Sequence, residues 1–273
     1  HIESSKIGQI LPMSLRYKIG VLKFHIQHYV TMHIAKWAVR FAKIQPLPNT
    51  ITGKRVLVIS PHPDDEVFGC GGLILRCIKA GNQPHVVILT DGANSLGEWR
   101  KEKEQIVAER VKLTDCATQA LGLKAENLHR FFLKDGILTE EIANISKQEL
   151  LMKKLKSMEP DYIFVPSPLG DSPDHLAANK FGTMLHDAMV SDGKCPELWN
   201  YCVWAWYCHP LQLVKRLSNL HLFKLSKEEH ETKLRAVNVY VLPEATTGQY
   251  WSGKLPSLFV AIHRWNRELY YKA

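Results

Sequence analysis

The residues most able to do chemistry lie in a short acidic run that contains one histidine. It reads SPHPDDE at 60–66 and places His62 beside Asp64, Asp65 and Glu66. Carboxylates at this density repel one another and usually need a cation or solvent beside them. Zn²⁺ accepts both imidazole nitrogen and carboxylate oxygen as ligands. The run therefore indicates a metal site, with a solvated acidic loop as the alternative, and Glu66 is expected to brace the following helix rather than to react.

A second cluster has the same character and reads PLGDSPDH at 168–175. Each cluster follows a short apolar run, at 55–60 and at 161–165, that predicts a buried strand. Because ligands bind at the carboxyl ends of the strands in open α/β sheets, both clusters are expected at one sheet edge. Two ligands from the first cluster and one from the second would leave an open position for water, as at a catalytic zinc. Water acidified there becomes a nucleophile, and a carboxylate beside it serves as base.

The two clusters and their surroundings resemble the PIG-L, or LmbE-like, deacetylases. The resemblance covers roughly residues 55–190. It implies a zinc-dependent hydrolase of linear amides that removes the acetyl group from an N-acetylated amino sugar or glycoconjugate. The segments that carry it are PHPDDE at 61–66, GCGG at 69–72, TDGANS at 90–95, Arg110 before Leu121 and Gly122, and PDH at 173–175.

The resemblance also implies a role for the matching residues. One zinc ion is expected on His62, Asp65 and His175. Asp64 is expected to be the general base, which takes a proton from water and delivers it to the departing amine. Asp174 is expected to take part in catalysis. Adjacent carboxylates in a loop point in different directions, which allows Asp65 to bind metal while Asp64 stays free.

Ser172 departs from the family pattern, in which a histidine at this position helps to stabilise the oxyanion. A neutral hydroxyl is a weaker electrophile than an imidazolium, so either Ser172 takes part with reduced activity or another residue substitutes for the histidine. The candidates in the C-terminal part of the chain are His209, His221 and His230. Each of them, taken alone, is also typical of an ordinary surface histidine.

Three further residues are candidates for binding substrate. Asp91 and Asn94 follow a predicted strand at 84–90 and could hydrogen-bond sugar hydroxyls, or they could simply be turn residues. Arg110 is expected to pair with a carboxylate or a substrate phosphate, with a solvated position on its helix as the alternative.

Strands and helices alternate along the chain, which predicts an α/β fold: a mostly parallel, Rossmann-like sheet with helices on both faces. The region after residue 190 is rich in Trp, Tyr and His and gives weaker signals. The predicted strands are 55–60, 84–90, 161–165 and 201–206, and the predicted helices are 70–80, 101–121, 140–158, 174–190 and 227–240.

An amphipathic helix is predicted ahead of this domain, at 18–44, because apolar residues recur there at spacings of three and four. Pro46 and Pro48 end it. Residues 1–50 are therefore expected to form the helix and a linker, and residues 51–273 the deacetylase domain. The helix either packs on the enzyme's own core or lies on an anionic membrane surface.

Composition narrows the class of protein. The 273 residues are 45% hydrophobic and 23% charged, which is typical of a globular chain, and no stretch reaches the roughly 18 apolar residues of a spanning helix. Six cysteines without a CxxC pair indicate reduced thiols and a cytoplasmic location, at the membrane surface if the first helix binds lipid. The net charge of +8 is not gathered into an arginine-rich arm, so no nucleic-acid partner is expected. Because the chain begins at His1, a trimmed form is expected.

Two other functions compete with deacetylation. A catalytically weakened relative that binds a glycan or glycolipid without turnover is suggested by Ser172. A nucleotide-binding Rossmann module is disfavoured because GCGG at 69–72 is not the GxGxxG fingerprint, and because the acidic run would repel a pyrophosphate.

Overall fold

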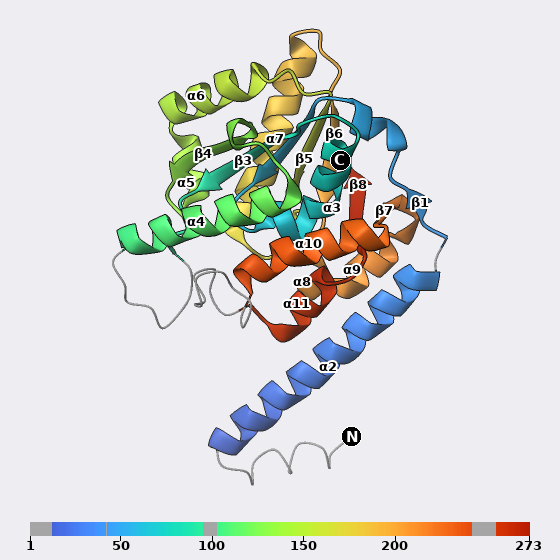
Figure 1. The fold of residues 1–273 in the computed structure, drawn as a ribbon. Coiled ribbons are helices and arrows are strands. Elements are labelled where there is room, and N and C mark those ends of the chain that lie inside the picture. Colours follow the sequence, from blue (N-terminus) through green and yellow to red (C-terminus); the bar gives the residue numbers. More distant parts are fainter. Residues whose placement is uncertain (1–12, 42, 95–102, 242–254) are drawn as a thin grey trace.

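The structure is a computed structural model that describes residues 13–41, 43–94, 103–241 and 255–273. Within these residues eight strands form one sheet, in the order β1-β7-β8-β6-β5-β2-β3-β4 (Figure 1). Every neighbouring pair is parallel except the two that involve β8. The prediction of a mostly parallel α/β sheet is confirmed. The strands are β1 (Gln45–Pro46), β2 (Val56–Ser60), β3 (His85–Thr90), β4 (Leu128–Leu133), β5 (Tyr162–Pro166), β6 (Glu197–Tyr201), β7 (Leu220–Lys224) and β8 (Arg267–Lys272).

Helices cover both faces of the sheet, because successive residues of each buried strand point to opposite sides. Val56 and Val58 of β2 face a cluster that includes α3, α4 and α10, whereas Leu57 and Ile59 face α5, α6 and α7. A third cluster joins α2, α8 and α9 to β7 and β8. The helices are α2 (Met13–Phe41), α3 (Asp65–Lys79), α4 (Lys103–Leu121), α5 (Leu138–Ala143), α6 (Ile145–Lys156), α7 (Pro173–Ser191), α8 (Ala205–Cys208), α9 (Pro210–Lys215), α10 (Lys227–Tyr240) and α11 (Ser257–His263).

The GCGG segment lies inside α3 and not in a turn ahead of it. The helix begins at Asp65, and two acidic residues in its first turn suit the positive end of the helix dipole. Gly69 is required by close packing, since a Cβ there would lie 2.3 Å from Cδ2 of Tyr201. The absence of a side chain therefore brings α3, and the loop before it, close to the sheet.

Two of the predicted elements need correction. The strand expected at 201–206 is instead β6, which ends at Tyr201, and Ala205–Cys208 forms the helical turn α8. The helix expected at 140–158 is divided at Asn144, whose side chain caps α6 by accepting a hydrogen bond from the Lys147 N–H. No strand was predicted where β1, β4, β7 and β8 lie. Residues 101–102 of the helix predicted at 101–121 lie outside the described residues, and α4 begins at Lys103.

The N-terminal helix is present as α2 and extends away from the rest of the molecule (Figure 1). The segment that follows it pairs with β7 through β1, and Leu47 and Ile51 are buried in the core. The boundary predicted at residue 50 stays a prediction. No helix in the described ranges is long and apolar enough to cross a membrane.

Candidate active site

The loop between β2 and α3 carries the first acidic cluster to the carboxyl edge of the sheet. β2 pairs with β3 on one side and with β5 on the other, so the loops after all three strands meet at this edge. Asp64 has a φ of +133°, which is rare for a residue with a side chain and marks local strain. Glu66 holds this conformation, because its carboxylate accepts hydrogen bonds from the Asp64 N–H at 2.9 Å and from the Tyr240 hydroxyl at 2.8 Å. Glu66 therefore braces the loop ahead of α3, whereas the sequence predicted that it braces the helix itself.

His62, Asp65 and His175 converge at the edge. Asp65 Oδ2 lies 3.2 Å from His62 Nδ1 and 3.2 Å from His175 Nε2. One ligand atom from each of the three residues lies within 4.8 Å of the others. His175 Nε2 is buried and makes no hydrogen bond within the described chain, although Asp65 is at ion-pair distance. The ring nitrogen and the carboxylate oxygen therefore point toward a common position rather than directly at each other.

This arrangement fits a tetrahedral zinc site. Ligand distances of about 2.0–2.1 Å imply that neighbouring ligand atoms are about 3.3 Å apart, close to the observed separations. Two imidazoles and one carboxylate are also a donor set that zinc accepts. Burial raises the pKa of Asp65, but His175 and His62 lower it far below its ordinary value, so this carboxylate is ionised and available as a ligand.

Two carboxylates orient the His62 ring from behind. Its Nε2 lies 3.2 Å from Asp174 Oδ2 and 3.2 Å from Asp135 Oδ1. Burial lowers the pKa of His62, but the hydrogen bonds to Asp135, Asp174 and Asp65 raise it well above the ordinary value. A proton on Nε2 that is shared with carboxylates leaves Nδ1 free to face the metal position.

Asp174 is saturated by hydrogen bonds and is held on the far side of His62. Its carboxylate accepts from the Gly136 N–H at 2.7 Å and from the Leu138 N–H at 3.0 Å, in addition to His62. His62, Asp135 and Asp174 could also hold a cation by distance alone. The backbone donors on Asp174 favour a hydrogen-bonded network instead, and a positioning role for Asp174 over the direct catalytic role expected from the sequence.

Asp64 precedes the candidate ligand Asp65 in the chain, is almost completely buried, and interacts electrostatically with Asp65 and His62. Burial raises its pKa to about 8, although the nearby Arg110 guanidinium acts in the opposite direction. A carboxylate with such a pKa can accept and return a proton near neutral pH. The geometry is therefore compatible with the role of general base.

Arg110 is buried beside the loop and is not the solvated helix residue that was one alternative. Its Nη2 donates a hydrogen bond to the Pro63 carbonyl at 2.8 Å and lies 3.6 Å from Asp64 Oδ2. The structure thus shows Arg110 pairing with a carboxylate of the protein itself. It positions the loop that carries Asp64.

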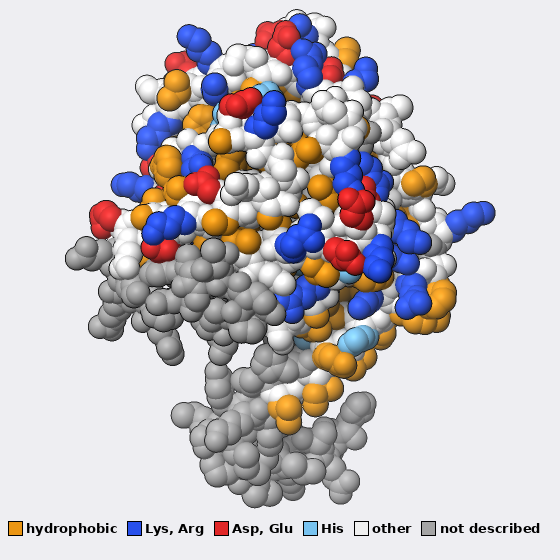
Figure 2. Space-filling view, viewed as in Figure 1, with side chains coloured by type: hydrophobic (Ala, Val, Ile, Leu, Met, Phe, Trp, Pro, Cys, Tyr) orange, Lys and Arg blue, Asp and Glu red, His pale blue; other side chains and the backbone are white. Residues whose placement is uncertain are grey.

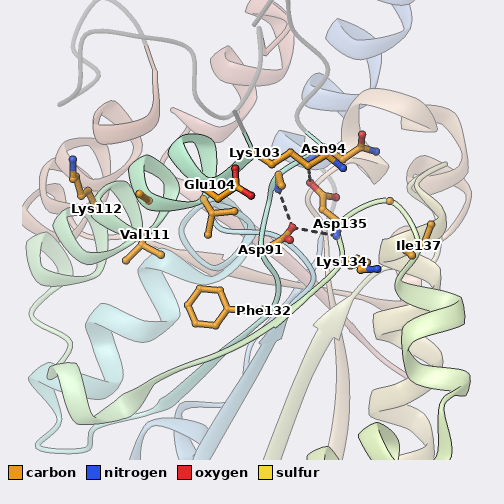
Figure 3. A pocket seen from close by; sticks show the side chains of 14 residues that line it. Asp91, Asn94, Lys103, Glu104, Val111, Lys112, Phe132, Lys134, Asp135 and Ile137 are labelled. Atoms are coloured by element: carbon orange, nitrogen blue, oxygen red, sulfur yellow. Dashed lines mark hydrogen bonds between the residues drawn. The ribbon is translucent and has the colours of Figure 1, made fainter. Parts of the chain in front are cut away.

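A cavity of about 950 Å³ opens beside the site, between α4 and the loop after β4 (Figure 3). Asp91 and Asn94 line it, together with Asp135 and Phe132. Asp91 Oδ1 accepts from the Asp135 N–H at 3.2 Å, and the Asn94 N–H donates to Asp135 Oδ2 at 2.9 Å. Asp91 and Asn94 therefore shape the turn and also face a space of the size that small ligands occupy. Ser95, the last residue of the TDGANS segment, lies outside the described residues.

The three C-terminal histidines lie in different places. His209 Nε2 is 2.7 Å from Asp171 Oδ1, in the loop that leads to Ser172 and His175. His221 contacts the Pro46 carbonyl and His230 contacts the Arg264 carbonyl. Ser172 itself begins α7 as its N-cap without a side-chain hydrogen bond. Of the three candidates, His209 is therefore the one held against the second cluster.

Asp135 was missed by reasoning from the sequence. It follows β4, a strand that was not predicted because its residues are mostly half-buried and show no clean alternation. A weak signal was available, since Lys134, Asp135 and Gly136 form a turn-like triplet after the apolar FFL run.

A buried histidine and aspartate cluster at the carboxyl edge of a parallel α/β sheet defines a candidate metalloenzyme. Residues 57–186 match the PIG-L family, described as GlcNAc-PI de-N-acetylase, which confirms the family resemblance of the motifs.

A curated relative shares sequence with about half of the chain. The chain is 26% identical over 134 residues to a diacetylchitobiose deacetylase of Thermococcus kodakarensis. The aligned segment is 47% of this chain and 48% of that protein. It thus spans about half the length of this curated relative.

Solved structures show the same fold. The N,N'-diacetylchitobiose deacetylase of Pyrococcus horikoshii superposes with a TM-score of 0.54 and 22% identity, over 78% of this chain and 77% of that one. The 4-carboxy-2-hydroxymuconate hydratase GalB of Pseudomonas putida superposes with a TM-score of 0.51 and 17% identity, over 81% and 96%. Since this fold occurs in a deacetylase and in a hydratase, the fold alone does not fix the reaction.

Proposed function

We propose that the chain is a zinc-dependent hydrolase that removes the acetyl group from an N-acetylated amino sugar or glycoconjugate. The match of residues 57–186 to a family of de-N-acetylases supports the reaction type. The observation that carries the proposal is the convergence of His62, Asp65 and His175, with a buried His175 Nε2 that has no hydrogen bond in the described chain. A divalent cation held between His175 Nε2 and Asp65 Oδ2 would give that nitrogen a partner.

His62, Asp65 and His175 would hold the zinc ion. When bound, zinc polarises a carbonyl group and acidifies a water molecule, which is the chemistry that amide hydrolysis requires. His62 is kept in the tautomer suitable for binding metal by Asp174 and Asp135.

Asp64 would move the proton. Its carboxylate is buried and interacts with the charges of Asp65 and His62, and it would accept a proton from the attacking water and return it to the nitrogen of the departing amine. The strained backbone at Asp64, the brace from Glu66 and the contact with Arg110 keep this carboxylate in place.

The sugar would occupy the cavity beside the site. Asp91 and Asn94 line it and are proposed to hydrogen-bond sugar hydroxyls. The cytoplasmic location and the expectation of no nucleic-acid partner remain predictions.

The second candidate function is a relative that binds glycans without turnover, and Ser172 is the observation that favours it. His209 argues for the active enzyme, because it lies against the same loop and could supply the missing imidazole.

Amine release from a panel of N-acetylglucosamine conjugates tests the proposal. The panel includes N,N'-diacetylchitobiose, with an N-acetylated amino acid as the control amide. We expect an amine from the sugars but not from the control. Binding of the sugars without release of an amine would favour the second candidate, and hydrolysis of the control alone would contradict both.

A further inference from the structure

One face of α2 carries a continuous row of exposed apolar side chains, here called the apolar stripe. Each member is at least 48% exposed, and Trp37 and Phe41 are exposed by 66% and 64%. From the first member to the last the stripe is about 28 Å long, at 1.5 Å per helical residue. Its members are Leu22, Ile26, Tyr29, Val30, Ile34, Trp37 and Phe41.

The opposite face of α2 attaches the helix to the enzyme. Met32, Ala35 and Val39 are buried in the cluster that contains Trp206 of α8 and Leu213 of α9. The stripe therefore faces away from the protein, and Figure 2 shows its hydrophobic side chains along the edge of the helix, beyond the body of the molecule. An apolar surface of this kind in one contiguous row marks an interaction site.

Positive charge accompanies the stripe. Residues 13–41 contain five Lys and Arg residues and no Asp or Glu. Near the end of the stripe Lys36, Arg40 and Arg267 form a cationic cluster around two aromatic rings. Lys36 Nζ and Arg267 Cζ lie 5.3 Å and 4.8 Å from the centre of the Trp265 ring, and Arg40 Cζ lies 5.8 Å from that of Phe41.

Within the described residues the cationic cluster has no carboxylate paired with it. Arg267 Nε is buried without a hydrogen-bond partner, and no carboxylate in the described ranges forms an ion pair with any of the three side chains. Burial and the nearby Arg40 lower the pKa of Arg267, so the like charges oppose one another. An anionic group from outside the chain would relieve this repulsion.

We propose that the apolar stripe and the cationic cluster dock the enzyme on an anionic lipid bilayer. The stripe lies at the boundary between headgroups and acyl chains, and the cluster lies against lipid phosphates. Trp37, Phe41 and Trp265 are residue types that suit this boundary. The helix lies on the membrane rather than across it, in agreement with its limited hydropathy.

Charge favours lipid over a second copy of the chain. Two copies that met through this face would bring two helices without acidic residues against each other, and like charges in a contact disfavour association. The proposed surface shares no residue with the candidate zinc site, and the proposal holds or fails without reference to the reaction.

Co-sedimentation with vesicles tests the docking surface. The 273-residue protein is mixed with vesicles of phosphatidylcholine alone or of phosphatidylcholine and phosphatidylserine in equal amounts. We expect binding to the anionic vesicles that weakens with added salt, and far weaker binding to the neutral ones. No binding to anionic vesicles at low salt would overturn the proposal.

Paired variants distinguish vesicle binding through this surface from nonspecific binding of the protein to lipid. Trp37→Ser with Phe41→Ser should lower the partition coefficient about tenfold or more, and Arg40→Gln about fivefold. The matched controls are Ile145→Ser with Leu150→Ser, which are 71% and 65% exposed on α6, and Lys153→Gln on the same helix. The controls should bind as the wild type does, and equal losses in both sets would contradict the proposal. Circular dichroism checks that each variant is folded.

Light scattering without lipid tests whether a second copy of the chain covers the apolar stripe instead. We expect a monomer whose mass the Trp37→Ser, Phe41→Ser variant leaves unchanged. A dimer that this variant dissociates would show that a second copy covers the stripe, and it would overturn the lipid proposal.

Discussion

Replacing Asp174 by asparagine tests whether this residue positions His62. The substitution keeps the size of the side chain but exchanges one acceptor oxygen for an NH₂ group. Asp174 Oδ1 accepts from the Leu138 N–H, whereas Oδ2 accepts from the Gly136 N–H and faces His62 Nε2. In either orientation of the amide, the NH₂ group meets a backbone donor. If it also faces His62, the ring avoids the clash only by moving its proton to Nδ1, which blocks the nitrogen that faces the metal position.

The magnitude follows from these contacts. A buried donor left without a partner costs about 1–3 kcal/mol of folding free energy. Loss of a group that orients a metal-binding histidine lowers metal affinity by about 10–100-fold. We expect Asp174→Asn to show both effects, while Asp187→Asn, on the exposed side of the same helix, shows neither.

Zinc affinity by competition with a chromophoric chelator, together with urea unfolding, measures the two effects. The positioning role would be refuted by a folded Asp174→Asn protein with wild-type zinc affinity. It would also be refuted if affinity were unchanged while turnover alone was lost, since this pattern belongs to a group that acts directly on the substrate.

Three further outcomes are expected. Asp64→Asn should keep its zinc, as metal analysis would show, and lose about 10²–10⁴-fold in turnover, whereas near-normal turnover would mean that another group is the base. If His209 replaces the missing imidazole, His209→Ala should lower turnover about 10²–10³-fold at unchanged zinc content. Ser172→His should then leave turnover unchanged or lower it. A gain of activity in Ser172→His would instead favour an oxyanion site that lacks its donor. Burial, together with the charge of His85, lowers the pKa of His129 from its ordinary value of 6.5 to about 4. As the pH falls from 6.5 toward 4, His129 therefore gains a proton in the unfolded state but not in the folded state. The urea midpoint should therefore fall over this pH range, and less so in His129→Gln; equal pH slopes would contradict this explanation.

The convergence of the two clusters was predictable because each cluster follows a buried strand of a mostly parallel sheet, and the structure shows that these strands, β2 and β5, are neighbours. Two loops that each follow a buried strand then meet at one edge, whatever the length of chain between them. The same reasoning could not place Asp135, since its strand β4 lacks the apolar pattern of the others. It also could not place β8, which comes from the end of the chain and inserts antiparallel between β6 and β7. Such long-range pairing has no local signal in the sequence.

The N-terminal helix illustrates a different limit. Apolar periodicity predicted a helix, but the apolar stripe that produces this periodicity is exposed, and the helix packs through Met32, Ala35 and Val39. Periodicity identifies an apolar face without saying what covers it, which is why the sequence left core packing and a membrane surface open as alternatives. The structure shows that the helix is attached by one face and exposes the other.

Restoring the zinc-free protein with measured amounts of zinc tests the central claim most directly. Amine release from N,N'-diacetylchitobiose, or from whichever sugar of the panel is hydrolysed, is followed during the titration in the wild type and in His175→Ala. We expect no activity without metal, full activity at about one equivalent of zinc, and no tight binding or recovery in His175→Ala. Full activity in the zinc-free protein, or full zinc occupancy and turnover in His175→Ala, would contradict the assignment of His62, Asp65 and His175 as the ligands of a catalytic zinc.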